Sequence, residues 1–117
     1  MRLVVLAAPV LALACLPASA QGAGGFYSGN DLRTLCADAD KNNLNFGLCF
    51  GFVVAIADAL ASTDGAYGWR ACFPANSTVG QDVAVVKRYL DQHPDRRHYG
   101  AGGLVADALG EAFPCKP

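Results

Sequence analysis

The fold is decided by residues 46–61, FGLCFGFVVAIADALA, in which Asp58 is the one ionisable residue besides Cys49. A helix that is apolar on nearly every side belongs at the centre of a domain, so we expect this segment to be the core helix. The alternative is a buried strand followed by a helix, because Phe50 to Val54 is rich in residues that favour sheets. At 16 residues the segment is too short for a membrane span, and none is predicted.

Gly47 and Gly51 lie four residues apart, on one face of the predicted helix, where a second backbone can approach closely. Close packing inside the domain is favoured over a membrane dimer. Asp58 lies near the end of the helix, where contact with water or an internal donor is favoured over a catalytic role.

A shorter helix is predicted before this segment. Ser28 or Asn30 caps it, Asp31 lies in its first turn, where the helix dipole favours an anion, and it ends at about Ala39. Residues 38–45 form a polar connection to the core helix.

Two more helices are predicted after a long irregular stretch, residues 62–77. Thr78 and Gln81 have the spacing of a capping box and begin a helix that runs to about Gln92 before Pro94. Its predicted apolar stripe consists of Val79, Val83, Val86 and Leu90, widened by Val85 and Tyr89, and its predicted outward residues are Asp82, Lys87, Arg88 and Asp91. The last helix covers residues 102–113 and has a weak, glycine-rich start. The predicted fold class is all-α, a small disulfide-stapled bundle of about four helices.

The N-terminus predicts export. Residues 1–20 contain the parts of a signal peptide: Arg2, an apolar run over residues 3–16, and the cleavage site Ala18-Ser19-Ala20. Cleavage there leaves one helical domain, residues 21–117. The alternative is a lipid anchor through Cys15, although the Ala-Ser-Ala site explains the segment more simply.

Four cysteines remain in the exported part, namely Cys36, Cys49, Cys72 and Cys115. An even number in a short secreted chain predicts two disulfides and a compartment outside the reducing cytosol. A Cys-only zinc site would use pairs two to four residues apart, whereas these separations are 13, 23 and 43 residues. No metal or other cofactor is therefore predicted.

The spacing alone leaves three pairings of these cysteines open. If the first two helices form an antiparallel hairpin across the polar connection, Cys36 and Cys49 face each other. We therefore predict the pairs Cys36–Cys49 and Cys72–Cys115. The second pair closes the longer loop, so on the chain-entropy model its loss should destabilise more, by about 4 rather than about 3 kcal/mol.

Charge and histidine content argue against two classes of function. The chain has nine basic and ten acidic residues. The basic residues are dispersed except at 96–98, so no concentrated positive face for nucleic acid is expected. His93 and His98 lie five residues apart and do not share a helical face as zinc-protease ligands do. The remaining groups considered for catalysis are Asp58, Asp91, Asp95, Ser28, Ser62 and Ser77. No nucleophile motif surrounds the serines, so an enzyme is not predicted.

Several fragments, taken in order, resemble one family. They are residues 26–36, Leu48-Cys49-Phe50-Gly51-Phe52, Ala57-Asp58-Ala59, Cys72-Phe73-Pro74, Gly80-Gln81, Val86-Lys87-Arg88-Tyr89-Leu90, His93-Pro94, Arg97-His98, Ala108-Leu109 and Glu111-Ala112-Phe113-Pro114-Cys115. This ordered set is similar to the pattern of the Rap/Tai immunity proteins, over nearly the whole exported chain.

The resemblance implies a small, mostly helical periplasmic protein that binds and neutralises a peptidoglycan amidase effector of type VI secretion. It also implies a homodimer, which fits an apolar helix surface larger than so small a domain easily buries. The alternative is a general periplasmic binding or chaperone-like helical module with no toxin partner.

The partner surface is expected on loops, because the apolar helix faces are committed to the core. Trp, Tyr and Arg are the side chains that most often anchor protein interfaces. The predicted partner-binding residues are Tyr67, Trp69 and Arg70 in the long irregular stretch, and Gln92, His93, Arg96, Arg97 and His98 before the last helix. Trp69 has an alternative role as a cover for one end of the core.

Overall fold

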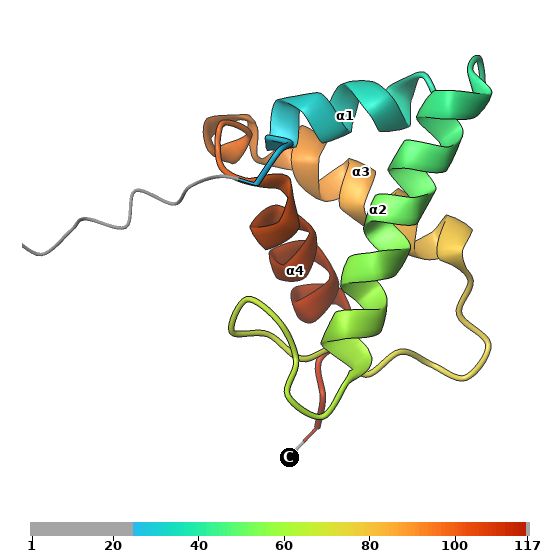
Figure 1. The fold of residues 1–117 in the computed structure, drawn as a ribbon. Coiled ribbons are helices and arrows are strands. Elements are labelled where there is room, and N and C mark those ends of the chain that lie inside the picture. The colour runs from blue at the N-terminus through green and yellow to red at the C-terminus, as the bar shows by residue number, and fades with distance from the viewer. Residues whose placement is uncertain (1–24, 117) are drawn as a thin grey trace, which may run out of the picture.

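The computed structural model describes residues 25–116 and shows a bundle of four α-helices (Figure 1). They are α1 (Gly29–Ala37), α2 (Asn43–Ala61), α3 (Val79–Gln92) and α4 (Ala101–Ala112), with a short 3₁₀-helix, η1 (Pro94–Arg96), between the last two. The described residues contain no strand, so the predicted all-α class is confirmed and the strand alternative for residues 50–54 is wrong. The predicted signal peptide and Cys15 lie outside the described residues.

Two helices begin with reciprocal capping boxes. The hydroxyl of Thr78 accepts a hydrogen bond from the backbone of Gln81, whose side chain accepts one from the backbone of Thr78. Ser28 and Asp31 make the same pair of bonds at the start of α1. The box predicted at Thr78 is confirmed, and Ser28 is the cap of α1 rather than Asn30.

The start of α2 differs from the prediction. The side chain of Asn42 accepts hydrogen bonds from the backbone of Leu44 and Asn45, so the helix begins at Asn43 instead of Phe46. With 19 residues, α2 is long and apolar enough to cross a membrane by length and composition alone, so the argument from a short segment is wrong. In this structure α2 packs against all three other helices.

The core lies on one side of α2. Its buried residues, Cys49, Val53, Ala57 and Leu60, recur at helical spacing and pack against α3 and α4. Gly47 and Gly51 lie on the other side, are exposed, and would have no neighbour within 4 Å of an added Cβ atom. The predicted packing of these glycines inside the domain is therefore wrong, because three short helices cover only one side of α2.

The buried face of α3 also differs from the prediction. Asp82, predicted to face outward, has only 8% of its surface exposed, whereas Val79 is 39% exposed. Asp82 lies one turn before Val86 and two turns before Tyr89, so helical geometry places it on the buried face. Val79 is the first residue of the helix and lies at the margin of the core.

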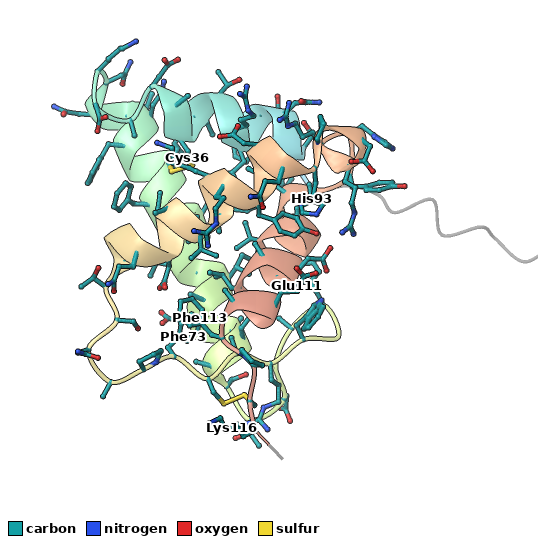
Figure 2. All side chains as sticks on the ribbon, turned by 180° about the vertical axis from the view of Figure 1, so that it is seen from behind. Cys36, Phe73, His93, Glu111, Phe113 and Lys116 are labelled. Carbon is teal, nitrogen blue, oxygen red and sulfur yellow. A yellow bond between two sulfur atoms is a disulfide. The ribbon has the colours of Figure 1, made fainter. Side chains whose placement is uncertain are left out.

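Both predicted disulfides are confirmed. Cys36–Cys49 joins α1 to α2 with a Cα–Cα distance of 5.0 Å, and Cys72–Cys115 joins the segment after α2 to the C-terminus with 4.9 Å. Beside the second bond, the rings of Phe73 and Phe113 lie 5.0 Å apart (Figure 2). The two bonds therefore fix opposite ends of the bundle.

Candidate functional site

The long loop, residues 62–78 between α2 and α3, contains a tight turn. Ala66 and Trp69 exchange two backbone hydrogen bonds of 2.9 and 2.8 Å around Tyr67 and Gly68. The φ angles of these central residues are 53° and 79°, as in a type I′ hairpin turn. Tyr67 thus holds a backbone conformation unfavourable for its side chain, which is 63% exposed. This turn was not predicted from the sequence, in which the glycine at position 68 is its only signal.

Side chains of this turn rest on α4. The indole Nε1 of Trp69 donates to Asp107 Oδ1 at 2.8 Å. A Cβ atom at Gly110 would lie 2.4 Å from Trp69 Cε3, and one at Gly102 would lie 2.3 Å from the hydroxyl oxygen of Tyr67. These two glycines are therefore the places where the long loop approaches α4. The partly buried Trp69 packs against the core, as its alternative role predicted.

The corner, residues 92–100 between α3 and α4, meets the same carboxylate. Arg96 Nη2 donates to Asp107 Oδ2 at 2.7 Å, and its Nη1 donates to the hydroxyl of Tyr89. The ring of His93 stacks on that of Tyr89 with centroids 4.1 Å apart, and its Nδ1 donates to the Tyr89 carbonyl at 2.8 Å. Two predicted partner-binding residues, His93 and Arg96, thus make their contacts within the domain, with Tyr89 of α3 and Asp107 of α4.

Arg97 is the predicted residue most fully engaged within the chain. Its guanidinium donates to the backbone carbonyls of Leu90 and Asp91, and its side chain is 18% exposed. Cations favour the C-terminus of a helix, so Arg97 completes the end of α3. A hydrogen bond from Arg33 is the main cause that lowers the pKa of the Asp91 carboxyl at this helix end.

The other predicted residues are open to solvent. Arg70, Gln92 and His98 are exposed, and the ring of His98 lies 4.2 Å from that of the exposed Tyr99. Figure 1 shows the first part of the long loop and the corner on the same side of the molecule, near opposite ends of α4, while the later part of the loop crosses to the other side and leads into α3. The structure therefore brings the two predicted segments to one side.

Asp107 joins these segments, although no role was predicted for it from the sequence. Three donors converge on its carboxylate: Trp69 Nε1, Arg96 Nη2 and the Tyr89 hydroxyl, the last at 3.5 Å. Burial, followed by the negative charge of Asp107, raises the pKa of Tyr89, while the charge of Arg96 opposes the shift. The Tyr89 hydroxyl therefore keeps its proton at neutral pH and remains a donor. The available signal was that Asp107 is the one charged residue between positions 101 and 110.

The described residues bring together no acid–base pair with either histidine. Neither imidazole hydrogen-bonds to a carboxylate or a serine hydroxyl within residues 25–116. In the same part of the chain, no three His, Cys, Asp or Glu side chains are grouped so that they could hold a metal ion. The site presents exposed aromatic and cationic side chains on two segments that hydrogen bonds to Asp107 hold against α4. Such side chains suit contact with another protein.

Comparison with known proteins identifies a family for this chain. The family model described as Rap1a immunity proteins matches residues 28–115, which include all four helices and all four disulfide cysteines. No curated protein and no solved structure matches the chain.

Proposed function

Because the chain belongs to the family of Rap1a immunity proteins, we propose that it is a periplasmic protein that neutralises a peptidoglycan amidase delivered by type VI secretion. Membership of the family makes it an immunity protein for a secreted effector. The amidase, the secretion route and the periplasm are the proposed refinements.

Export is supported by two independent features. Disulfides persist in oxidising compartments, and the structure contains two. Residues 1–20 have the composition of a signal peptide. An immunity protein that meets an amidase in the compartment of its substrate, peptidoglycan, would need such a location.

We propose that the partner binds across the long loop and the corner. The observation that carries this proposal is the strained turn at Tyr67, which holds a large aromatic side chain in solvent on a short, hydrogen-bonded hairpin. Backbone strain of this kind is concentrated at functional sites. Arg70 adds an exposed polar group on the same loop, and Gln92 and His98 add exposed polar groups on the corner, which His93, Arg96 and Arg97 support.

The test uses the product of an amidase-like gene adjoining the gene of this chain. The oxidised chain should inhibit that amidase on purified peptidoglycan at an equimolar ratio. The Tyr67→Asn/Arg70→Ala variant should weaken binding by about 2 kcal/mol, roughly 30-fold, because it removes interface anchors. Asparagine tolerates the left-handed backbone, so this variant should remain folded.

A matched control is Arg88→Ala, an exposed arginine on the outer side of α3. It should bind as tightly as the wild type. Unchanged affinity in the Tyr67→Asn/Arg70→Ala variant and in a Gln92→Ala/His98→Ala variant would remove the two loops from the proposal. Full amidase activity in excess wild-type chain would contradict the proposed function itself.

We also propose that the protein is a homodimer that uses the outer side of α2. Gly47, Gly51 and Ala55 are exposed and spaced four residues apart, so they form one small-residue face along the helix. Leu44, which begins this face, is 67% exposed. The exposed Asp58 is the one charged residue on the face and lies near the end of the helix, so the stretch from Leu44 to Ala55 carries no charge. Such a stretch suits self-complementary contact about a twofold axis, where two backbones approach closely.

Light scattering on the oxidised protein should give twice the chain mass. Ala55→Arg should convert the dimer to a monomer, because it places a charge at the centre of the contact. The control is Ala84→Arg, at an exposed alanine of α3. A wild-type protein that is monomeric at tens of micromolar, or an Ala55→Arg variant that stays dimeric, would overturn this assignment.

A further inference from the structure

One carboxylate connects two segments that are distant in sequence. Asp107 Oδ1 accepts from Trp69 of the long loop at 2.8 Å, and Asp107 Oδ2 accepts from Arg96 of the corner at 2.7 Å. The two donors lie 38 and 11 residues from Asp107 along the chain. Among residues 25–116, no hydrogen bond joins Trp69 directly to Arg96, so Asp107 is their shared partner.

The position of Asp107 suits it to hold both segments still. It lies in the middle of α4, a helix whose other side is buried in the core. Its side chain is 21% exposed, which limits screening of the ion pair by solvent and salt. Both hydrogen bonds are charge-assisted and short, and such bonds are about twice as strong as neutral ones.

The glycines of α4 add a steric argument. Gly102 and Gly110 leave the space in which Tyr67 and Trp69 lie against the helix, and Trp69 also packs on the core. The long loop therefore lies on α4 by shape, and Trp69–Asp107 is its side-chain hydrogen bond to the helix. Just beyond the helix, the Cys72 N–H···O=C Phe113 hydrogen bond and the Cys72–Cys115 disulfide hold the later part of the loop. The corner is bound to the other oxygen of the same carboxylate through Arg96.

We propose that Asp107 is a positioning residue that locks the long loop and the corner into one preformed recognition surface. The role in recognition rests on the proposed function; the coupling of the two segments does not. A surface ordered before the partner arrives loses less conformational entropy on binding and so binds more tightly. The partner would then meet Tyr67 and the corner residues in a fixed relative position.

The coupling is tested in the free, oxidised protein through the exchange of the indole Nε1 proton, measured by NMR. Trp69 is the only tryptophan, so this proton gives a single indole signal. Asp107→Ala should accelerate its exchange about tenfold, as expected for loss of a hydrogen bond to a charged acceptor. Arg96→Ala should also accelerate it, by about threefold, because the carboxylate loses the partner that orients it.

The decisive variant combines both changes. If Asp107 transmits the effect, Arg96→Ala should cause no further acceleration in the Asp107→Ala background. The matched control is Arg33→Ala, which also removes an arginine 2.7 Å from a carboxylate, that of Asp91, but should leave the indole signal unchanged. An Arg96→Ala protein that folds and shows wild-type exchange, or equal effects in both backgrounds, would overturn the coupling.

The role in recognition is tested separately with the amidase of the proposed function. Arg96 is itself a predicted partner-binding residue, so Asp107→Ala, which retains Arg96, Trp69 and Tyr67, separates lost positioning from a lost direct contact and should also slow association. Arg96→Ala should slow association about tenfold, whereas Arg96→Lys, which keeps the charge, should restore part of the rate. If Arg96→Ala accelerates indole exchange but leaves the association rate unchanged, the two segments are coupled but the coupling has no role in recognition. That part of the proposal would then fail.

Discussion

At the scale of single residues, Asp82 is the most unusual side chain in the described part of the chain. It is 8% exposed, and its Oδ1 atom is buried without a hydrogen-bond partner among residues 25–116. Burial raises the pKa of this carboxyl above its ordinary value of 3.8. The folded state therefore prefers the protonated form more than the unfolded state does. It follows that ionisation of Asp82 destabilises the fold as pH rises above 3.8 through the raised value.

Asp82→Asn should consequently stabilise the protein at neutral pH, by about 1 kcal/mol, because the amide carries no charge to desolvate. The gain should shrink as pH falls and disappear below pH 3.8, where aspartate is protonated in both states. Urea unfolding at several pH values measures this difference. Asp40→Asn, at an exposed carboxylate without a hydrogen bond in the described structure, should show no such trend. A gain that is independent of pH would rule out the ionisation of Asp82 as its cause.

The errors of the sequence analysis at this scale have a common origin. Asp82 was placed on the surface because it is charged, although its spacing to Val86 and Tyr89 places it on the buried face. Asp107 was overlooked because its donors, Trp69 and Arg96, are brought to it by tertiary structure. Local pattern identifies which residues carry charge, but not which of them the fold brings together.

At the scale of elements, the starts of α1 and α3 could be predicted because capping is local, although the start of α2, capped by Asn42, was not predicted. Ser28 and Thr78 each bond within three residues, so sequence alone contains the whole interaction. The environment of α4 was not readable in this way. The glycines at its start predicted only a weak helix start, and no role was predicted for Gly110, whereas the structure shows that Gly102 and Gly110 admit side chains of the long loop.

The contact of Trp69 with Gly110 predicts opposite effects of alanine substitution at two glycines of α4. Gly110→Ala should destabilise the protein by about 1–3 kcal/mol, because the new methyl group overlaps the rigid indole of Trp69. Gly103→Ala should stabilise it by about 0.5–1 kcal/mol, because a Cβ atom there meets nothing within 4 Å and alanine favours the helix. Urea unfolding measures both, and Trp69 emission should shift to the red only in Gly110→Ala. Equal stabilities of the two variants would refute the packing of Trp69 on α4.

At the scale of the whole molecule, the class of fold followed from four helical patterns in a short chain. The disulfide pairing followed less directly, because spacing leaves three pairings open and the expected hairpin of the first two helices selected one of them. The exposure of α2 did not follow, because its sequence is apolar on every side and only assembly shows which side the other helices cover. We propose that a second copy of the chain covers that exposed side, in the homodimer described above.

The two disulfides should also differ in how they respond to reductant. Cys36 and Cys49 are 2% and 0% exposed in the core, whereas Cys72 is exposed and Cys115 is partly exposed. Thiol–disulfide exchange requires access of a thiolate to a sulfur atom, so Cys72–Cys115 should be reduced first in the native protein. We expect its reduction to be at least about tenfold faster, since attack on the buried bond requires local unfolding of α1 from α2.

Brief exposure to a low concentration of dithiothreitol, followed by alkylation and peptide mapping, measures this order. Alkylated Cys72 and Cys115 should appear while Cys36 and Cys49 remain joined, and mild urea should narrow the difference by opening the α1–α2 hairpin. Simultaneous reduction of both bonds in the native protein would show that the α1–α2 hairpin opens as readily as the C-terminus.

The burial of Cys36–Cys49 has a second consequence, because replacing both residues by alanine removes core contacts as well as the crosslink. That added loss offsets the advantage of about 1 kcal/mol that loop length alone gives to Cys72–Cys115. The two double-alanine variants should therefore have similar free energies of unfolding.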